Sequence, residues 1–517
     1  MKNKLIVDLK KSKLSLSNSP SKYESFIKEI QPGIKYESSN TRVNMPGSKN
    51  FPIPSGQFIS TNFWINQTFN PENVDNVYAV GSGMDSQCNS FILMADYWTS
   101  PNNPNQDSGQ NFLLQKFNDA GDLVWNRVFD FEEDGTTYTF MDVQTMIVDK
   151  DDNIIVFVIP SFASGARRTG IVKFDNDGNQ LWSKVLLSDL PENVYNAEGV
   201  NSIAFDASNN MYISLSIYDT AISPNSFISV RKISPAGVVL ASKTITFANP
   251  FYESFINVNS IGEVYLVGRD STAPDYKNYI IKLDSSLNEI WNKSFSTTYN
   301  AYIYGVALDK DENIVFQTGN GASAYDINPL YGAYIKVSPA GEIIWTTRIS
   351  NVINPDYSLG TYQLNSDADG NVYISSVYIE DIPDYPDTSN SLIVAKLSPA
   401  GAFEWAYFVQ PSSQSIDSWF WYSPIAGTVK NNCLVLGYYD NIDPFNAQMF
   451  KLPLTPVANG VYGDYTFTDI TDQWTTSSPE LTLSDDTATY EDGPTDTSPL
   501  TYITFEGNTY TTTFTSL

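Results

Sequence analysis

The sequence predicts an all-β fold, a seven-bladed β-propeller that is closed by its own N-terminal strand. Three observations predict it. A lysine–turn–tryptophan segment recurs along the chain, a hairpin segment with Asp, Asn and Gly at its turn alternates with it, and each end of the array carries only half a unit. Each unit reads as four short antiparallel strands, and units of this kind bury both flat sides only by stacking radially.

The first segment reads lysine, apolar residue, short turn, apolar residue, tryptophan and an alternating strand. Trp125, Trp182, Trp291, Trp345 and Trp405 share one position, to which we assign Leu240 in the third copy. We expect these tryptophans to pack between blades rather than to form a ligand platform. The copies are KFNDAGDLVWNRVF from Lys116, KFDNDGNQLWSKVL from Lys173, KISPAGVVLASKTI from Lys232, KLDSSLNEIWNKSF from Lys282, KVSPAGEIIWTTRI from Lys336 and KLSPAGAFEWAYFV from Lys396.

The second segment is a strand, a turn rich in Asp, Asn and Gly, and another strand. These residues tolerate the positive φ that tight hairpin turns need. The copies are IVDKDDNIIVFVI from Ile147, AFDASNNMYISLSI from Ala204, NVNSIGEVYLVG from Asn257, ALDKDENIVFQTG from Ala307, NSDADGNVYISSV from Asn365 and GTVKNNCLVLGYY from Gly427. DNDGN and DADGN resemble part of a calcium loop, but they lack its full spacing and terminal Glu, so turn formation is the better interpretation.

The two incomplete units lie at opposite ends of the array. Lys451 begins the first segment, but no tryptophan strand follows it, whereas FWINQTF at 63–69 matches LVWNRVF without a preceding lysine strand. With Trp64 included, the seven positions are spaced 51 to 61 residues apart, which suits four short strands. We therefore predict that residues 58–69 complete a last blade whose inner strands come from about 420–453, which removes the exposed edge of the ring.

The KxSPAGxxxW and DxDGNxY units resemble the β-propeller repeats of bacterial extracellular and virion proteins, over about residues 57–455. The resemblance implies a propeller fold and a non-catalytic role, while function varies among such proteins. Leu240 and the two chain ends depart from the pattern. The expected organisation is a basic N-terminal arm at 1–56, the propeller at 57–455 and an acidic, Thr/Tyr-rich C-terminal β extension at 456–517.

The composition excludes several function classes. The 517 residues include no histidine, which rules out Ser/His/Asp and Cys/His nucleophile systems. A net charge of −28 argues against nucleic-acid partners. We expect neither a signal peptide nor membrane insertion, because no apolar stretch is long enough. Cys88 and Cys433 make at most one disulfide, and we expect two thiols instead.

The two chain ends have opposite charge. Residues 1–50 carry ten Lys or Arg against four Asp or Glu, whereas ten acidic residues and no basic residue follow Lys451. The extension is rich in β-branched and aromatic residues, which favours short strands. These ends are either solvated or held by a neighbour. We expect the second case, in which the arm and the extension bind other protein subunits of an assembly.

The two faces of the predicted propeller differ. Tight DxDGN and SPAG turns lie on one face, and long connections rich in Asp, Tyr and Pro lie on the other. Aromatic rings beside carboxylates suit a glycan or a protein interface, although Tyr and Pro can equally serve to stiffen long loops. The candidate ligand- or partner-binding residues are Tyr97, Trp98, Tyr218, Asp219, Tyr276, Tyr325, Asp326, Tyr378, Tyr385, Trp419, Trp421, Tyr438 and Asp440.

Three functions remain open. The first is a non-enzymatic propeller subunit of a large extracellular particle, a phage or virus tail, fibre or capsid surface, which could contact a cell-surface glycan of the host. The second is a stand-alone glycan-binding propeller. The third is a glycan hydrolase or lyase that uses carboxylates, although no pair stands out. The first is preferred, with no catalytic residue, no metal and no cofactor.

Overall fold

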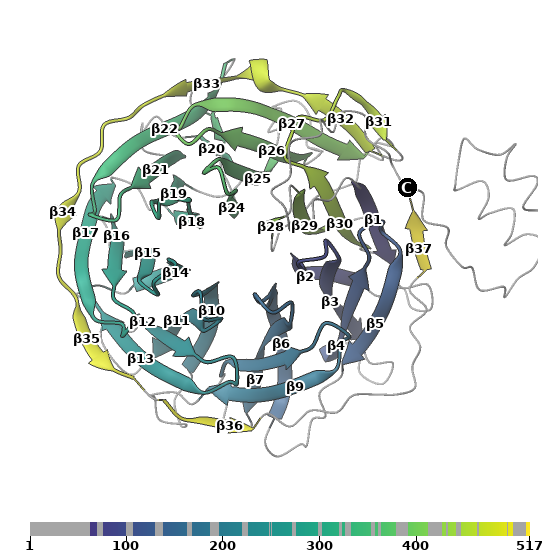
Figure 1. The fold of residues 1–517 in the computed structure, drawn as a ribbon, viewed down its shortest axis with the longest axis horizontal. Coiled ribbons are helices and arrows are strands. Elements are labelled where there is room, and N and C mark those ends of the chain that lie inside the picture. The colour runs from purple at the N-terminus through teal and green to yellow at the C-terminus, as the bar shows by residue number, and fades with distance from the viewer. Residues whose placement is uncertain are drawn as a thin grey trace, which may run out of the picture.

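The computed structural model shows an all-β propeller, in which sheets stand around a central axis (Figure 1). Apart from one 3-10 helical turn at Thr471–Gln473, the regular structure that it describes is β. None of the described residues form a helix long and apolar enough to cross a membrane. The structure describes residues 63–69, 76–99, 107–129, 138–162, 168–186, 196–219, 226–247, 249, 251–270, 276–297, 302–319, 323–325, 332–352, 357–359, 363–378, 391–411, 427–430, 433–440, 446–462, 465–493, 495–499 and 513–516.

The described strands form seven antiparallel sheets, numbered I to VII here in chain order. Sheet I contains β2 (Asn76–Met84), β3 (Ser90–Thr99), β4 (Asp107–Phe117) and β5 (Leu123–Phe129). Sheet II contains β6 (Tyr138–Val148), β7 (Ile154–Phe162), β8 (Gly170–Phe174) and β9 (Gln180–Leu186). Sheet III contains β10 (Asn196–Phe205), β11 (Met211–Asp219), β12 (Ser226–Ile233) and β13 (Val239–Thr246).

The remaining sheets follow the same order from the axis outward. Sheet IV contains β14 (Phe251–Val258), β15 (Val264–Asp270), β16 (Tyr276–Leu283) and β17 (Glu289–Thr297). Sheet V contains β18 (Tyr302–Leu308), β19 (Ile314–Gly319), β21 (Ala333–Val337) and β22 (Ile343–Asn351), with β20 (Ser323–Tyr325) and β23 (Tyr357–Leu359) added. Sheet VI contains β24 (Gln363–Ser366), β25 (Val372–Tyr378), β26 (Ser391–Leu397) and β27 (Phe403–Pro411).

Sheet VII joins the two ends of the repeat array. It contains β28 (Gly427–Lys430), β29 (Cys433–Asp440), β30 (Asn446–Pro453) and the N-terminal β1 (Trp64–Phe69). Strand β1 lies antiparallel to β30, with Trp64 opposite Lys451 and Ile65 opposite Phe450. The predicted pairing of the two incomplete units is therefore confirmed, although the described strand begins at Trp64 rather than at residue 58.

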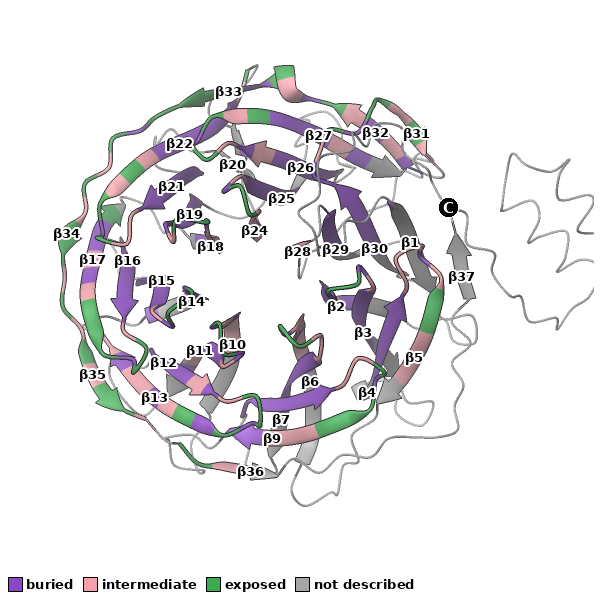
Figure 2. Ribbon diagram, in the orientation of Figure 1, coloured by how far each residue is buried: buried purple, intermediate pink, exposed green. Residues whose placement is uncertain are grey.

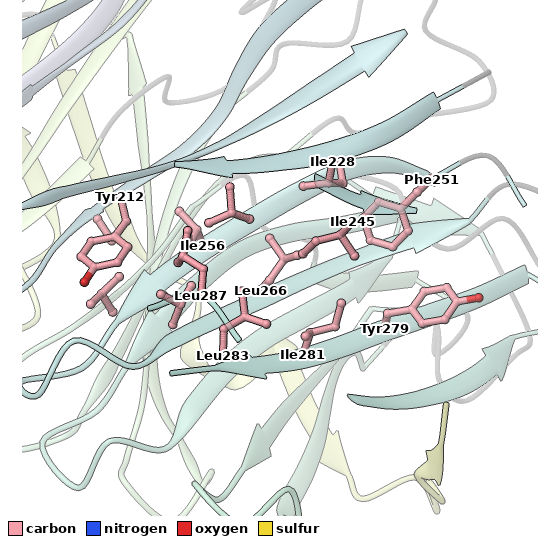
Figure 3. Close-up of a cluster of buried hydrophobic side chains, with 14 of the residues drawn as sticks. Tyr212, Ile228, Ile245, Phe251, Ile256, Leu266, Tyr279, Ile281, Leu283 and Leu287 are labelled. Atoms are coloured by element: carbon pink, nitrogen blue, oxygen red, sulfur yellow. The ribbon is translucent and has the colours of Figure 1, made fainter. Parts of the chain in front are cut away.

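Hydrophobic cores lie between neighbouring sheets. One core joins Tyr212, Ile228 and Ile245 of sheet III to residues of sheet IV that include Phe251 and Leu266 (Figure 3). In Figure 2 the strands nearer the axis are largely buried, whereas the outer strands alternate between buried and exposed residues. Burial on both flat sides explains why the second and third strands are almost continuously apolar, as in VYLVGRD and AYIKV.

The C-terminal extension forms a belt around the outside of the ring, drawn in yellow in Figure 1. From sheet VI to sheet II it visits the sheets in the reverse of their chain order, and in each of these five sheets it pairs antiparallel with the outermost strand. The belt strands are β31 (Gly460–Tyr462) and β32 (Tyr465–Asp469) on sheet VI, β33 (Trp474–Ser477) on V, β34 (Ser484–Asp485) on IV, β35 (Thr489–Asp492) on III and β36 (Thr497–Pro499) on II. Farther along, β37 (Thr513–Ser516) pairs with β1 of sheet VII.

The extension pairs with the sheet edges of its own chain, whereas we had expected it to bind a neighbouring subunit. Its strands cover the edges of β27, β22, β17, β13 and β9, which otherwise would offer unpaired backbone groups to another chain. The binding of other subunits by the extension thus stays a prediction that must involve its outward face. The N-terminal arm lies outside the described residues.

Candidate functional site: a structural face and a candidate binding face

Tight turns connect the first strand to the second on one face of the ring. In sheet II, an oxygen of Asp149 accepts hydrogen bonds from the backbone N–H groups of Asp151 and Asn153, each at 2.9 Å. The Asn153 side chain also donates to Asp149, at 3.1 Å. The same Asp-to-Asn geometry recurs in sheets I, III, V and VI. The Asp and Asn residues therefore build turns, as the sequence predicted.

In sheets I, II, IV and V, the repeated lysine and tryptophan tie the sheet to the next one. On sheet V, Lys336 and Trp345 stand opposite each other on β21 and β22, and both donate to the carbonyl oxygen of Pro399 in the SPAG turn of sheet VI, at 2.9 and 3.1 Å. Equivalent pairs donate to Asn176, Pro235 and Pro339 in the following sheets. The tryptophan thus supplies a hydrogen bond between sheets as well as packing.

The turn glycine is required by this contact. Gly401 has a φ of +79°, and a Cβ atom there would lie 2.6 Å from the Trp345 ring. Ala241, and not the predicted Leu240, stands opposite Lys232 at the tryptophan position of sheet III, whereas Leu240 is 51% exposed. The matching turn of sheet IV has Leu287 in place of glycine, with a φ of +67° and full burial. Ala241 packs against the core that contains Leu287, so a smaller residue at the tryptophan position accompanies a larger one at the glycine position.

The lysines are paired with the Asp turns of their own sheets. Lys336 lies 2.5 Å from Asp309 and Lys173 lies 2.8 Å from Asp149, with all four side chains at most 5% exposed. Burial raises the pKa of Asp309, but hydrogen bonds from Asn313 and Lys336 lower it more, so the net pKa lies below the ordinary value. These carboxylates are charged members of a structural network.

Sheet IV keeps the pairing with different residues. Asn259 stands at the Asp position of its turn, and Glu263 stands where the other sheets have Asn. Lys282 then binds Glu263 at 2.7 Å. No group of three metal-ligating side chains occurs among the residues that the structure describes. The polar groups of this face serve to connect sheets, and we refer to it below as the structural face.

The opposite face collects the predicted binding residues at the ends of strands. Backbone positions place Tyr97 and Trp98 in the last three residues of β3, Tyr218 and Asp219 at the end of β11, Tyr378 at the end of β25, and Tyr438 and Asp440 in the last three residues of β29. Tyr276 begins β16 and Tyr325 ends β20. These positions recur at one rim of the ring. Asp326, Tyr385, Trp419 and Trp421 lie outside the described residues.

A buried carboxylate on this face was not among the predicted residues. Asp270 ends β15 and is fully buried, and it accepts hydrogen bonds from the Lys277 backbone at 3.1 Å, the Asn249 side chain at 3.1 Å and the Tyr279 hydroxyl at 3.3 Å. Burial raises the pKa of Tyr279, and the charge of Asp270 raises it further. The only sequence signal was an Asp directly after an apolar strand. Asp270 thus joins the end of β15 to the start of β16.

Comparisons with known proteins extend only to the fold. No protein-family model matches the chain, and no curated protein matches it. A Dyadobacter fermentans protein of unknown function is 9% identical, and the match covers 77% of this chain and 97% of that protein, with a TM-score of 0.41. A GH130-family structure described as targeting β-1,2-mannosidic linkages is 10% identical over 80% of this chain and 99% of its own, with a TM-score of 0.30. NanB is 12% identical over 78% and 71%, with a TM-score of 0.34. These values carry no inference about function.

Proposed function

We propose that the protein is a non-enzymatic, seven-bladed propeller that serves as a structural and binding subunit of a large extracellular assembly. The observation that carries the proposal is the difference between the two faces. Side chains on the structural face are committed to bonds between sheets. At the opposite rim, aromatic and acidic residues end equivalent strands of sheets I, III, VI and VII. A repeated aromatic rim suits an interface, which needs large rigid side chains.

The assembly that we propose is a phage or virus particle, in which the rim could also recognise the host surface. The resemblance of the repeats to those of virion proteins and the opposite charges of the two chain ends support this choice. The belt offers outward acidic residues, among them Asp472, Glu480 and Glu491, that a basic arm of another copy could bind. The rim and the arm then have separate roles, which can be tested separately.

The first test addresses assembly. We expect the full chain to form species larger than its 57.6 kDa monomer in mass photometry. Reversing arm charges at Lys10, Lys11 and Lys13 to Glu should return it to the monomer, whereas the same reversal at Lys310, an exposed lysine of the structural face, should not. A monodisperse wild-type monomer at all concentrations would overturn the assembly proposal.

The second test addresses the rim. A triple variant, Trp98→Ala with Tyr218→Ala and Tyr438→Ala, is compared with a control triple at exposed apolar residues elsewhere, Leu181→Ala, Val238→Ala and Ile261→Ala. Both are incubated with an array of immobilised glycans. Retention lost only in the rim variant supports a binding rim. Glycan binding by a chain that stays monomeric would favour the stand-alone lectin, and glycan cleavage detected by mass spectrometry would favour the hydrolase or lyase.

A further inference from the structure

The two cysteines lie at the place where the ring closes. Cys88 is in the first turn of sheet I, and Cys433 begins β29 of sheet VII. Both are fully buried, and both belong to one core that spans these two sheets, together with Met84, Phe117 and Val435. Some 345 residues of chain separate them. The ring closes at this junction, where sheet VII, the last sheet, packs against sheet I, the first.

The repeat predicts where the Cys88 side chain is directed. Cys88 has a φ of +66°, and the equivalent turn positions of later sheets include Asp152, Asn209 and Glu312, which also have positive φ. Each of these three side chains reaches back to the first turn of the preceding sheet. Asn209, for example, donates to Asp151 at 2.7 Å.

For sheet I the preceding sheet is VII, whose first hairpin pairs Lys430 with Cys433. The same geometry therefore directs Cys88 toward the first hairpin of sheet VII, whose second strand begins at Cys433.

Bonds on both sides hold the two residues at this junction. Lys451 donates to the Cys88 carbonyl oxygen at 3.0 Å, and Lys430 donates to the Met84 carbonyl oxygen at 3.3 Å. Cys433 stands opposite Pro453, two residues beyond Lys451 on β30. These bonds and the shared core hold both residues at the junction of sheets VII and I.

We propose that Cys88 and Cys433 are a cross-linking site, whose thiols are reduced in this structure and which oxidation converts to a disulfide that joins the first sheet to the last. The oxidant is a small disulfide such as glutathione disulfide. One thiolate attacks it and releases one glutathione thiol, and the second cysteine thiolate displaces the other glutathione from the mixed disulfide. Two protons leave the protein, and the electron pair passes to the two glutathione thiols. Extracellular conditions preserve such a bond.

The bond closes a very long loop, so it restricts the unfolded chain strongly. Oxidation should therefore raise the midpoint of thermal unfolding by several degrees, and reduction should reverse the rise. It should also prevent β1 and the last inner strands from separating completely, because the sheets on the two sides of the junction stay covalently joined.

The test uses the full chain incubated with glutathione disulfide at a temperature just below unfolding, then blocked with N-ethylmaleimide. We expect an intact mass 2 Da below that of the reduced chain with no blocked cysteine, and one peptide pair that links Cys88 to Cys433. Persistence of two blocked thiols would overturn the proposal, and so would separate glutathione adducts on each cysteine. The peptide map needs no variant.

Cys88→Ala and Cys433→Ala serve as matched controls, and each should lose the oxidation-dependent rise in midpoint while keeping the reduced-state midpoint within a few degrees. If one variant fails to fold, the other supplies the same comparison. A rise that survives in either variant would show that the stabilisation comes from elsewhere and would contradict the proposed link.

Discussion

The ring and its belt are held by opposite physical means. In the ring, Lys336 and Asp309 are at most 5% exposed, and their bond joins two buried elements of sheet V. In the belt, Asp485 and Asp492 bind Lys293 and Lys243 while 87% and 91% exposed. A buried pair is poorly screened, whereas an exposed pair contributes little and weakens with salt. Similar Lys–Asp pairs therefore contribute strongly to the stability of the ring where they are buried, and only weakly to the binding of a belt strand where they are exposed.

The belt itself is uneven along its length. Its first part buries Tyr465, Phe467, Ile470 and Trp474 against sheets V, VI and VII. Beyond residue 480, β34 to β36 are two to four residues long, and their described side chains are mostly exposed. Since packing supplies most of the stability of such contacts, the belt should open first at the β34 to β36 side.

The largest effect is expected inside the ring. Asp309→Ala leaves Lys336 buried without its carboxylate and removes the acceptor of the Asn313 turn. Loss of one member of a buried pair costs about 3–5 kcal/mol of the free energy of unfolding. Urea unfolding measures it, with Asp311→Ala as the control, because Asp311 is 64% exposed in the same turn. Equal stability of the two variants would contradict the idea that burial gives the Lys336–Asp309 pair its large contribution.

Removal of the belt anchor should act locally. Trp474 is 6% exposed and packs with Ile349 and Leu359 of sheet V. Trp474→Ala should cost about 3–5 kcal/mol of local packing. Limited proteolysis should then cut the extension much faster, while the ring unfolds at an unchanged urea concentration. The control is Val461→Ala, at a 65% exposed belt position. Unfolding of the ring together with the belt would show that the two are one cooperative unit.

Acid should weaken the ring. Burial raises the pKa of Asp149, but hydrogen bonds from Lys173 and Asn153 lower it more, and the net pKa lies below the ordinary value. A carboxylate with a lowered folded-state pKa stabilises the protein above its unfolded pKa of about 3.9, and this contribution disappears as the pH falls through the folded-state value. We expect urea stability to decrease below about pH 5. Asp149→Asn should show a shallower decrease than Asp151→Asn.

The exception in sheet III should behave as a coupled pair. Ala241→Trp alone should destabilise, because the added ring would meet Leu287, and Leu287→Gly alone should leave a cavity. The double variant rebuilds the Trp–Gly contact seen between Trp345 and Gly401. A double-mutant cycle in urea should give a favourable coupling of about 0.5–3 kcal/mol. Additive effects would mean that Ala241 and Leu287 do not compensate each other.

The smallest effect is expected in the outer belt. Lys243→Met together with Lys293→Met removes two exposed ion pairs. Cleavage between residues 484 and 499 should become faster at low salt, and the difference from the wild type should vanish near 1 M salt, where the Debye length is about 3 Å. Lys310→Met, which removes an exposed pair within one turn, is the control. If the difference in cleavage rate persists at high salt, these pairs are as poorly screened as the buried pairs of the ring.

The repeats were enough to predict the propeller and its closing strand, because alternation, turn residues and the missing half-units are local features that β1 and β30 share with the other sheets. The rim residues were also predictable as positions, since an acid or aromatic residue after an apolar strand marks a strand end. The contribution of Asp270 was not, because its partners Asn249 and Tyr279 come from separate segments.

The path of the extension was decided only by the tertiary structure. YTFTD and WTTS look like strands in the sequence, but a period of two residues does not specify which edge a strand will join. The folded ring presents its outermost strands in a circle, and lysines on β13 and β17 mark where acidic belt residues can pair. The role of the lysine–tryptophan motif is likewise visible only in the folded chain, where both side chains donate to one carbonyl oxygen of the next sheet.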